Sequence, residues 1–552
     1  MPGLERLSHY KLFWLQGDLL AGITVAAYLI PQCMAYGELA GVGPVEGLWA
    51  ILPPMLIYGL FGSSPQLSVG PESTTAIMTA AAVAPLVAAS GASYALLASL
   101  LACLVGVVCL VGYVARLGFL TNLLSKPILI GYLAGVAIIM MAGQLGKISG
   151  LTLEADSVFG QIQEFFSQLN QIHKPTLTLA LLVLTFLFVI QRRFPKAPGP
   201  LLAVLLATLA TWLLHLEQRG LAVVGTVPAE LPHLVIPNLL SPSTLSLLSS
   251  AIGIAIVGYS DNVLTARAFA SRHHYRVDAN QELLALGASN LGAGLMQGFP
   301  VSSSSSRTVM GDALGGKTQL FSVVAFAVVI CVLLFFRPVL ALFPKAALGA
   351  IIIFAATKLI EVKEFRRLKR FRRTELALAL STTLGVLFTN ILVGVGVAVG
   401  LSVIDLLARV VKPHDAVLGE VPGVPGLHDI EDWPGAETRP GLVLYRYDAP
   451  LCFANVENFK RRALDEIAAE VRSVEWFVLD TEAIAEIDIT AVDMLRDLQT
   501  ELAVQGITLG LARVKQNLYA QLARSGLLEQ IGPKHIFLTL HTAIDGFENR
   551  HR

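Results

Sequence analysis

The sequence contains few charged residues. Aspartate, glutamate, lysine and arginine together make up only 14% of its 552 residues, whereas about 25% is usual in soluble domains. Apolar residues make up 54%, and the mean hydropathy is +0.66. These values exclude a purely soluble protein and indicate a polytopic membrane protein with a soluble part attached.

Cysteine is also scarce, and the motifs of common enzymes are absent. The five cysteines form no Cys-x-x-Cys pair, so neither a metal site nor a disulfide is expected, and we expect small buried apolar side chains instead. We find no nucleophile–base pair. The glycines at 294–298 and 315–316 lack the spacing of a nucleotide-binding loop. The sequence therefore predicts no enzyme, no cofactor except a possible coupling Na⁺, and no nucleic-acid partner.

Long apolar stretches are present in two sets of seven. A membrane-spanning helix needs about 20 apolar residues, or fewer where the helix is broken. We predict fourteen transmembrane segments at 18–37, 45–61, 71–89, 93–115, 121–142, 176–191, 200–216, 245–266, 279–297, 302–314, 318–336, 343–360, 374–391 and 393–411.

Basic residues predict the orientation of these segments. Lysine and arginine gather before the first segment and in alternate loops, most densely at 363–373, while the loops at 145–175 and 218–243 hold few. Because positive charge concentrates on the cytoplasmic side, both termini are predicted to be cytoplasmic. The expected location is the plasma or inner membrane.

The two sets of seven have matching polar interruptions. Gln32 precedes Glu72 by 40 residues, and Asp261 precedes Ser302 by 41. An odd number of segments per set gives the two halves opposite topology. Broken polar segments at matching places in inverted halves point to the substrate site of a transporter.

The most polar of these interruptions runs from Gly298 to Gly311. It contains the five serines Ser302–Ser306 followed by Arg307. If these serines open a half-helix, its free amide groups and positive dipole end form an anion site. We predict Ser302, Ser303, Ser304, Ser306 and Arg307 as substrate ligands. The alternative is a close helix contact made by small residues, with Arg307 at the membrane surface.

A carboxylate and a hydroxyl one helical turn apart form a candidate cation site. Asp261 and Thr265 share a helix face, and they could carry the coupling ion as a proton on the carboxylate or as bound Na⁺. In the alternative interpretation, Asp261 pairs with Arg267 at the membrane surface.

Two further pairs are predicted near the substrate. Glu72 and Ser73 open the third segment, where Glu72 would stabilise a helix start, carry a proton or pair with Arg307. Gln32 and Tyr36 share one face of the first segment. Hydrogen bonding between helices is the alternative role for this second pair.

The last part of the chain has a different character. Five prolines occur in 412–440, which predicts a linker between a transmembrane domain, 1–411, and a soluble domain, 441–552. Strands are predicted at 442–447, 476–479 and 507–512, alternating with helices at 456–471, 491–504 and 516–524. This alternation predicts a small α/β domain.

These features together resemble the sulfate permease (SulP) family of anion transporters, whose members end in a STAS domain. The resemblance covers nearly the whole chain. Its motifs are Pro31-Gln-Cys-Met-Ala-Tyr36, Gly47-Leu-Trp-Ala50, Phe61-Gly-Ser-Ser64, Val69-Gly-Pro71, Ala266-Arg-Ala-Phe-Ala270, Asp278-Ala-Asn-Gln-Glu-Leu283, and Gln297-Gly-Phe-Pro300 running on to Ser306-Arg-Thr308.

The resemblance implies two intertwined inverted repeats of seven helices, as in uracil permease, with a core domain that moves against a gate domain. It also implies a substrate site between half-helices 3 and 10, with Gln32 and Tyr36 beside it, a cation-linked acid at Asp261, and a homodimer. Glu72 departs from the less polar residue that is common in the family. Asp488-Ile-Thr490 replaces the Asp-Ser-Ser phosphoacceptor motif, so Asp488 and Thr490 are candidate regulatory residues.

The resulting prediction is a secondary active transporter for a small anion, coupled to H⁺ or Na⁺. Sulfate is the expected substrate, and bicarbonate, chloride or a dicarboxylate is compatible with the same site. The alternatives are an uncoupled channel or exchanger, and a membrane-anchored signalling scaffold whose STAS domain binds a protein or nucleotide.

Overall fold

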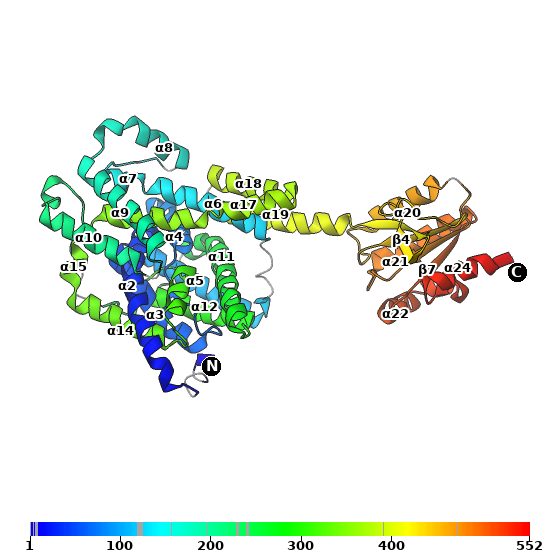
Figure 1. The fold of residues 1–552 in the computed structure, drawn as a ribbon, viewed down its shortest axis with the longest axis horizontal. Coiled ribbons are helices and arrows are strands. Elements are labelled where there is room, and N and C mark those ends of the chain that lie inside the picture. Colours follow the sequence, from blue (N-terminus) through cyan, green and yellow to red (C-terminus); the bar gives the residue numbers. More distant parts are fainter. Residues whose placement is uncertain are drawn as a thin grey trace. The chain divides into compact units, whose positions relative to one another are not determined.

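A computed structural model describes residues 2–551 except 4, 6–8, 119–124, 156, 196, 228–230, 239–241, 390 and 471. The chain divides into two compact units, Met1–Ser402 and Val403–Arg552. Figure 1 shows a helical first unit and a second unit built on a sheet.

Each of the fourteen predicted segments coincides with a helix, although residues 121–124 of one segment and residue 390 of another lie outside the described part. Within the described part of the chain, six helices are long and apolar enough to cross a membrane, and three more are apolar but shorter. The number of crossings therefore stays a prediction. The helices are α2 Leu15–Ala40, α3 Pro44–Phe61, α4 Ser73–Ser90, α5 Tyr94–Val114, α6 Lys126–Gly143, α9 Lys174–Arg193, α10 Gly199–Leu213, α11 Pro242–His273, α12 Ala279–Leu295, α13 Ser305–Ala313, α14 Leu320–Phe335, α16 Lys345–Leu359, α18 Arg373–Phe388 and α19 Ile391–Val411.

Glycine allows several of these helices to pack at short range. A Cβ atom at Gly47 of α3 would lie 2.0 Å from the carbonyl oxygen of Cys33 in α2, and one at Gly131 of α6 would lie 2.0 Å from that of Ala379 in α18. Close approach of this kind is the usual role of small residues between membrane helices. Substitution of either glycine would force the two backbones apart.

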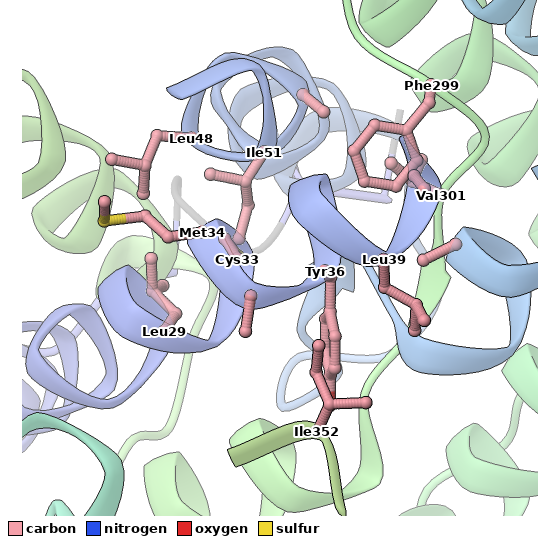
Figure 2. Close-up of a cluster of buried hydrophobic side chains, with 14 of the residues drawn as sticks. Leu29, Cys33, Met34, Tyr36, Leu39, Leu48, Ile51, Phe299, Val301 and Ile352 are labelled. Carbon is pink, nitrogen blue, oxygen red and sulfur yellow. The ribbon is translucent and has the colours of Figure 1, made fainter. Parts of the chain in front are cut away.

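The apolar core of the first unit extends to the residues just before the serine stretch. Figure 2 shows Phe299 and Val301 in the same buried cluster as Leu39 and Tyr36 of α2. Phe299 is 0% exposed and Val301 is 1% exposed. Their burial holds the chain in place where it turns toward the serines.

A buried carboxylate connects three helices on another side of the core. Glu282 of α12 accepts hydrogen bonds from the Tyr58 hydroxyl, from both the amide and the hydroxyl of Ser63, and from the Asn262 side chain of α11. The side chain of Glu282 is fully buried. These donors satisfy the carboxylate in the interior and tie the end of α3 to α11 and α12.

The five cysteines are free thiols. Cys33, Cys103 and Cys109 are buried as expected, but Cys331 on α14 is exposed and Cys452 is partly exposed. The prediction of burial is wrong for these two residues. Cys331 lies on an apolar helix surface, which a membrane protein can leave uncovered by its own chain.

The second unit is a six-stranded sheet in the order β4-β3-β5-β6-β7-β8, with its last four strands parallel. The strands are β3 Asp415–Val421, β4 Val424–Asp429, β5 Leu442–Tyr447, β6 Trp476–Asp480, β7 Thr508–Ala512 and β8 Ile536–Phe537. The helices are α20 Val456–Ala469, α21 Ile489–Val504, α22 Gln516–Arg524, α23 Leu527–Ile531 and α24 Leu540–Glu548.

Alternating side chains give this sheet two apolar faces. Val443 and Tyr445 of β5 pack in the cluster that contains α20 to α23, whereas Leu442 and Leu444 pack with α24. This alternation follows from the period of two along a strand. The strands and helices predicted after residue 441 are present.

The prediction of a linker at 412–440 is wrong for residues 415–429, because they contain β3 and β4. These two strands pair with each other, and β3 also pairs with β5. Prolines favour a linker in the sequence, but they are compatible with strands at these positions. Pro422 falls in the turn between β3 and β4, and Pro425 lies in β4 at the edge of the sheet, where proline is tolerated. Residues 415–429 are therefore an integral part of the sheet.

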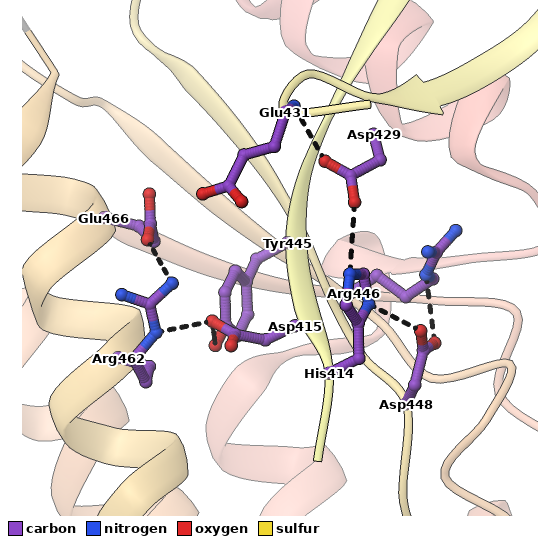
Figure 3. A network of polar contacts seen from close by, with 9 residues as sticks. All are labelled: His414, Asp415, Asp429, Glu431, Tyr445, Arg446, Asp448, Arg462 and Glu466. Atoms are coloured by element: carbon purple, nitrogen blue, oxygen red, sulfur yellow. Dashed lines mark hydrogen bonds and ion pairs between the residues drawn. The ribbon is translucent and has the colours of Figure 1, made fainter. Parts of the chain in front are cut away.

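A network of polar side chains connects β3, β5 and α20, as Figure 3 shows. The Asp415 carboxylate accepts hydrogen bonds from the Tyr445 hydroxyl at 2.7 Å and from Arg462 at 2.8 Å, and Arg462 also pairs with Glu466. Burial raises the pKa of Tyr445, and the Asp415 carboxylate raises it further. The Tyr445 hydroxyl thus stays protonated and donates to Asp415, which fixes β3 against β5 and α20.

Candidate anion-binding site

Two short strands bring the starts of two half-helices together. β1, Val69–Gly70, pairs antiparallel with β2, Ser302–Ser303, so that Val69 lies opposite Ser303 and Gly70 opposite Ser302. Helix α4 begins at Ser73 and helix α13 at Ser305. Because the strands satisfy each other's backbone groups, the chain can leave helical structure deep within a helical domain.

The chain on either side of β2 is held by side-chain bonds. The Asn290 amide of α12 bonds to both backbone groups of Val301, at 2.9 and 3.0 Å. The Ser304 amide donates to the carbonyl of Ser68, and the Ser68 amide donates to the Thr308 hydroxyl. The position of the serines therefore depends on α12 and on the segment before β1.

A cavity of about 490 Å³ lies beside these helix starts. Nine of the predicted site residues line it, while Arg307 and Thr265 are not among its lining residues. The nine are Gln32, Tyr36, Glu72, Ser73, Asp261, Ser302, Ser303, Ser304 and Ser306. The sequence thus predicted most of one wall of this cavity, and residues from four separate segments do meet.

The two helix starts differ in how their amides are occupied. Glu72 is the N-cap of α4: its carboxylate accepts from the Thr74 amide at 2.8 Å and from the Ser73 hydroxyl at 2.9 Å. Ser304 is the N-cap of α13, and its side chain makes no capping bond and contacts the Ser306 hydroxyl. The uncapped amides of α13 are therefore the better anion donors, and Glu72 has the role of a helix-start carboxylate.

Arg307 lies behind the cavity wall. Its side chain is 0% exposed, so it is not at the membrane surface as the alternative interpretation had it. The guanidinium donates to the Pro71 carbonyl oxygen at 2.8 Å, to the Ser68 hydroxyl at 3.3 Å and to the Gln32 side chain at 3.4 Å.

These contacts differ from the direct anion contact that we predicted for Arg307. Its third nitrogen, Nη2, is buried without a hydrogen-bond partner among the described residues. The side chain turns back because the break before α4 leaves the Pro71 carbonyl in need of a donor. In this conformation Arg307 supports the link between β1 and α4 and adds positive charge beneath the helix starts.

Asp261 and Thr265 both contact the serine stretch. The Asp261 carboxylate accepts from the Ser303 hydroxyl at 3.2 Å, and the Thr265 and Ser305 hydroxyls lie 3.0 Å apart. Asp261 faces the cavity, whereas Thr265 packs between α11 and α13. One face of α11 thus contacts both β2 and the start of α13.

The first segment contributes three residues to the cavity. The Gln32 amide donates to the Tyr36 hydroxyl at 3.0 Å, so the predicted pair bonds within its own helix. Tyr28, one turn earlier on the same face, also lines the cavity. Tyr28 was not among the predicted site residues, although its spacing of four residues from Gln32 places both on one helix face.

Other lining residues of the cavity were not predicted. They include Phe354 and Lys358 of α16, Gln191 of α9, and Glu361. These residues occur in or at the ends of ordinary apolar stretches, where a polar residue is commonly a surface residue. The fold, and no local sequence pattern, assigns them to the cavity.

In the second unit, Asp488 is the N-cap of α21. Its carboxylate accepts from the Ala491 amide at 2.9 Å and from the Phe453 amide at 2.7 Å. Thr490 is exposed on the first turn of the same helix. The geometry accounts for Asp488 as a capping residue, and the regulatory role of both residues stays a prediction.

Comparison with known proteins agrees with this organisation. Residues 15–382 match the model of the sulfate permease family, and residues 434–543 match the STAS domain. The chain is 52% identical to the protein named "Probable sulfate transporter MT1781" of Mycobacterium tuberculosis (strain CDC 1551 / Oshkosh), over 100% of this chain and 98% of that protein. It is 31% identical to "Probable sulfate transporter 4.2" of Arabidopsis thaliana, over 96% and 80% of the two chains.

Among solved structures, the murine Solute Carrier 26 family member A9 anion transporter has a similar fold. Its TM-score is 0.91 at 23% identity, over 100% of this chain and 94% of that chain. The matches support a multi-pass helical membrane protein with a STAS domain, whose function is transport and not catalysis. The chain therefore belongs to the sulfate permease family of anion transporters.

Proposed function

We propose that the chain is a secondary active transporter of sulfate that works by alternating access, with the anion held between the facing starts of α4 and α13. The observation that carries this proposal is the β1–β2 pairing, which places the uncapped start of α13 at the wall of the cavity. Both relatives described above are named as probable sulfate transporters.

The chemistry of the wall suits a small oxyanion. The serine hydroxyls at 302–304 and 306, with Tyr28 and Tyr36, offer several O–H donors around one cavity. The α13 amides and the buried Arg307 supply positive potential without a mobile counter-ion. Bicarbonate, chloride and small dicarboxylates fit the same description, so they belong in the substrate panel.

Coupling is assigned to Asp261. Its carboxylate contacts Ser303 and lines the same cavity, so gain of a proton or of Na⁺ there would change the charge that the anion meets. For Na⁺, the ligands would be Asp261, the nearby Thr265 hydroxyl and backbone oxygens. Either ion would favour entry of an anion that Asp261 otherwise repels.

The remaining features of the proposal concern assembly. We place the protein in the plasma or inner membrane as fourteen crossings in two inverted repeats, with core and gate domains, cytoplasmic termini and a homodimeric state. Support for the repeats comes from β1 and β2, since each short strand precedes a half-helix at the equivalent place in its own half. A protein or nucleotide partner of the STAS domain stays a prediction.

Uptake into proteoliposomes tests the proposed function. The purified full chain is expected to accumulate radiolabelled sulfate above its equilibrium level when a pH or Na⁺ gradient is imposed, and excess unlabelled sulfate should compete. Protein-free liposomes are the control. Downhill flux without accumulation under either gradient would favour the uncoupled channel or exchanger, and the absence of flux for every anion in the panel would favour the scaffold.

A further inference from the structure

The charges that line the cavity are unexpected for an anion site. Among the described lining residues, three are acidic, namely Glu72, Asp261 and Glu361, and Lys358 is the one basic side chain. Arg307 is committed to Pro71, Ser68 and Gln32 behind the wall. Among the described lining residues, the cation available to an anion in this cavity is therefore Lys358 on α16.

Lys358 is positioned by the cavity wall. Its Nζ atom lies 3.2 Å from the Oε1 atom of Gln191 on α9 and 4.3 Å from the ring centre of Phe354, one turn earlier on α16. Phe354 is 4% exposed, and all three residues line the cavity. The ring quadrupole attracts a cation that lies over an aromatic face. Phe354 and Gln191 therefore favour this position of the Lys358 ammonium at the cavity wall.

The held ammonium still has capacity for a ligand. An ammonium group has three donors, of which Gln191 takes one. Because the Gln191 oxygen faces Lys358, its amide nitrogen remains as a second donor at the same wall. The pair thus offers a positive charge and neutral donors together, which suits an oxyanion better than a spherical halide.

The simpler interpretation is that Lys358 extends toward the membrane surface, as lysines near helix ends often do. Both Lys358 and the next basic residue, Lys363 on α17 (Val362–Phe371), are exposed. Lys363 does not line the cavity and fits that description. Lys358 differs in its contacts with Phe354 and Gln191, both of which are wall residues. The two lysines therefore form a matched pair for experiment.

We propose that Lys358, with Gln191, forms an outer oxyanion-binding station of the cavity, which receives the anion before it reaches the α13 start. This inference rests on the proposed transport function and adds a substrate-recruiting residue to it. Because the Lys358 side chain is exposed, its attraction should raise the local concentration of anions and weaken as salt screens it. The divalent charge of sulfate strengthens this effect relative to a monovalent anion.

The test uses the full chain in proteoliposomes and in detergent, with variants Lys358→Gln, Lys358→Arg and Lys363→Gln. At about 0.01 M potassium gluconate, Lys358→Gln should weaken radiolabelled sulfate binding about tenfold. At about 1 M gluconate the difference from wild type should fall below roughly threefold. Lys358→Arg and Lys363→Gln should bind within about twofold of wild type at both salt concentrations.

Each other outcome contradicts the proposal in a recognisable way. Wild-type sulfate affinity in a folded Lys358→Gln variant would overturn it and leave the transport function standing. An equal loss in Lys363→Gln would show a general surface-charge effect in place of an outer station. If wild-type protein neither binds nor takes up sulfate, the proposed function itself fails, before any variant is compared.

Discussion

Replacing Arg307 by alanine is expected to reduce sulfate transport about 100-fold or more and to lower the thermal stability of the protein. The guanidinium is fully buried and supports the Pro71 carbonyl at 2.8 Å, the Ser68 hydroxyl and Gln32. Its removal leaves the buried Pro71 carbonyl without a donor, which destabilises the folded state by about 1–3 kcal/mol. It also leaves a void in the core. The β1–α4 link would then lose its support at the point where α4 faces α13.

This expectation separates two roles for Arg307. A residue that only contacts the anion would raise the sulfate KM and leave the melting temperature unchanged, because its contacts form only with substrate. A residue that supports the β1–α4 link should change both values. Uptake kinetics and thermal unfolding in detergent, measured on the same preparations, distinguish the two cases.

Arg272→Ala is the matched control for this experiment. Arg272 bonds to Asp312 near the far end of α13, and its side chain is 67% exposed. An exposed ion pair is worth about 0–1 kcal/mol, so transport should stay within about threefold of wild type. Unchanged stability and unchanged affinity in Arg307→Ala would show that the structural role assigned to this arginine is wrong.

Asp261→Asn is expected to abolish accumulation driven by an ion gradient while sulfate binding is retained. The amide keeps the size of the side chain, and its oxygen can still accept from the Ser303 hydroxyl, now at 3.2 Å from the carboxylate. It cannot carry a charge or release a proton. Exchange of sulfate for sulfate should therefore continue when net uphill transport stops.

The response to pH then identifies the coupling ion. If Asp261 carries a proton, wild-type uptake rises as the external pH falls, and the asparagine variant loses this dependence. If Asp261 binds Na⁺, wild-type uptake requires Na⁺ and weakens at low pH, because the protonated acid no longer binds the cation. Counterflow and gradient-driven uptake, measured across a pH series with and without Na⁺, resolve these cases.

Glu72→Gln is the comparison for the coupling assignment, because the Glu72 carboxylate also lines the cavity. Its carboxylate caps α4 through the Thr74 amide, and glutamine retains an oxygen that can do the same. We expect coupling to persist in this variant. Wild-type accumulation in Asp261→Asn together with its loss in Glu72→Gln would transfer the coupling role to Glu72.

The positions of the helices were predictable from the sequence because burial in a bilayer imposes long apolar stretches. The placement of Glu72 and the serines around one cavity was predictable. Glu72 follows Gly70-Pro71 and the serines follow Pro300, and these breaks occur at equivalent positions in the two sets of seven segments. The strands after Leu442 were predictable from alternation, since Val443 and Leu444 face opposite sides of the sheet.

Other features depend on contacts that local patterns do not contain. The direction of the Arg307 side chain is set by its hydrogen bond to the Pro71 carbonyl, which lies 236 residues away in the sequence. Lys358 belongs to the cavity through Phe354 and Gln191, and a lone lysine at the end of an apolar stretch has no distinctive sequence signal. Residues 415–429 were misread as linker because their prolines lie at a sheet edge and in a tight turn.

The central claim is that the anion binds at the start of α13, and protection of a cysteine from modification tests it most directly. In a background without the five native cysteines, Ser306→Cys places a thiol at the cavity wall, and Ser243→Cys places one at the far end of α11 as the control. Saturating sulfate is predicted to slow modification of Ser306→Cys by a charged thiosulfonate reagent about tenfold or more, because the bound anion covers the thiol, and to leave Ser243→Cys unchanged. Equal modification rates with and without sulfate at Ser306→Cys, in a variant that still takes up sulfate, would place the anion elsewhere and contradict the account.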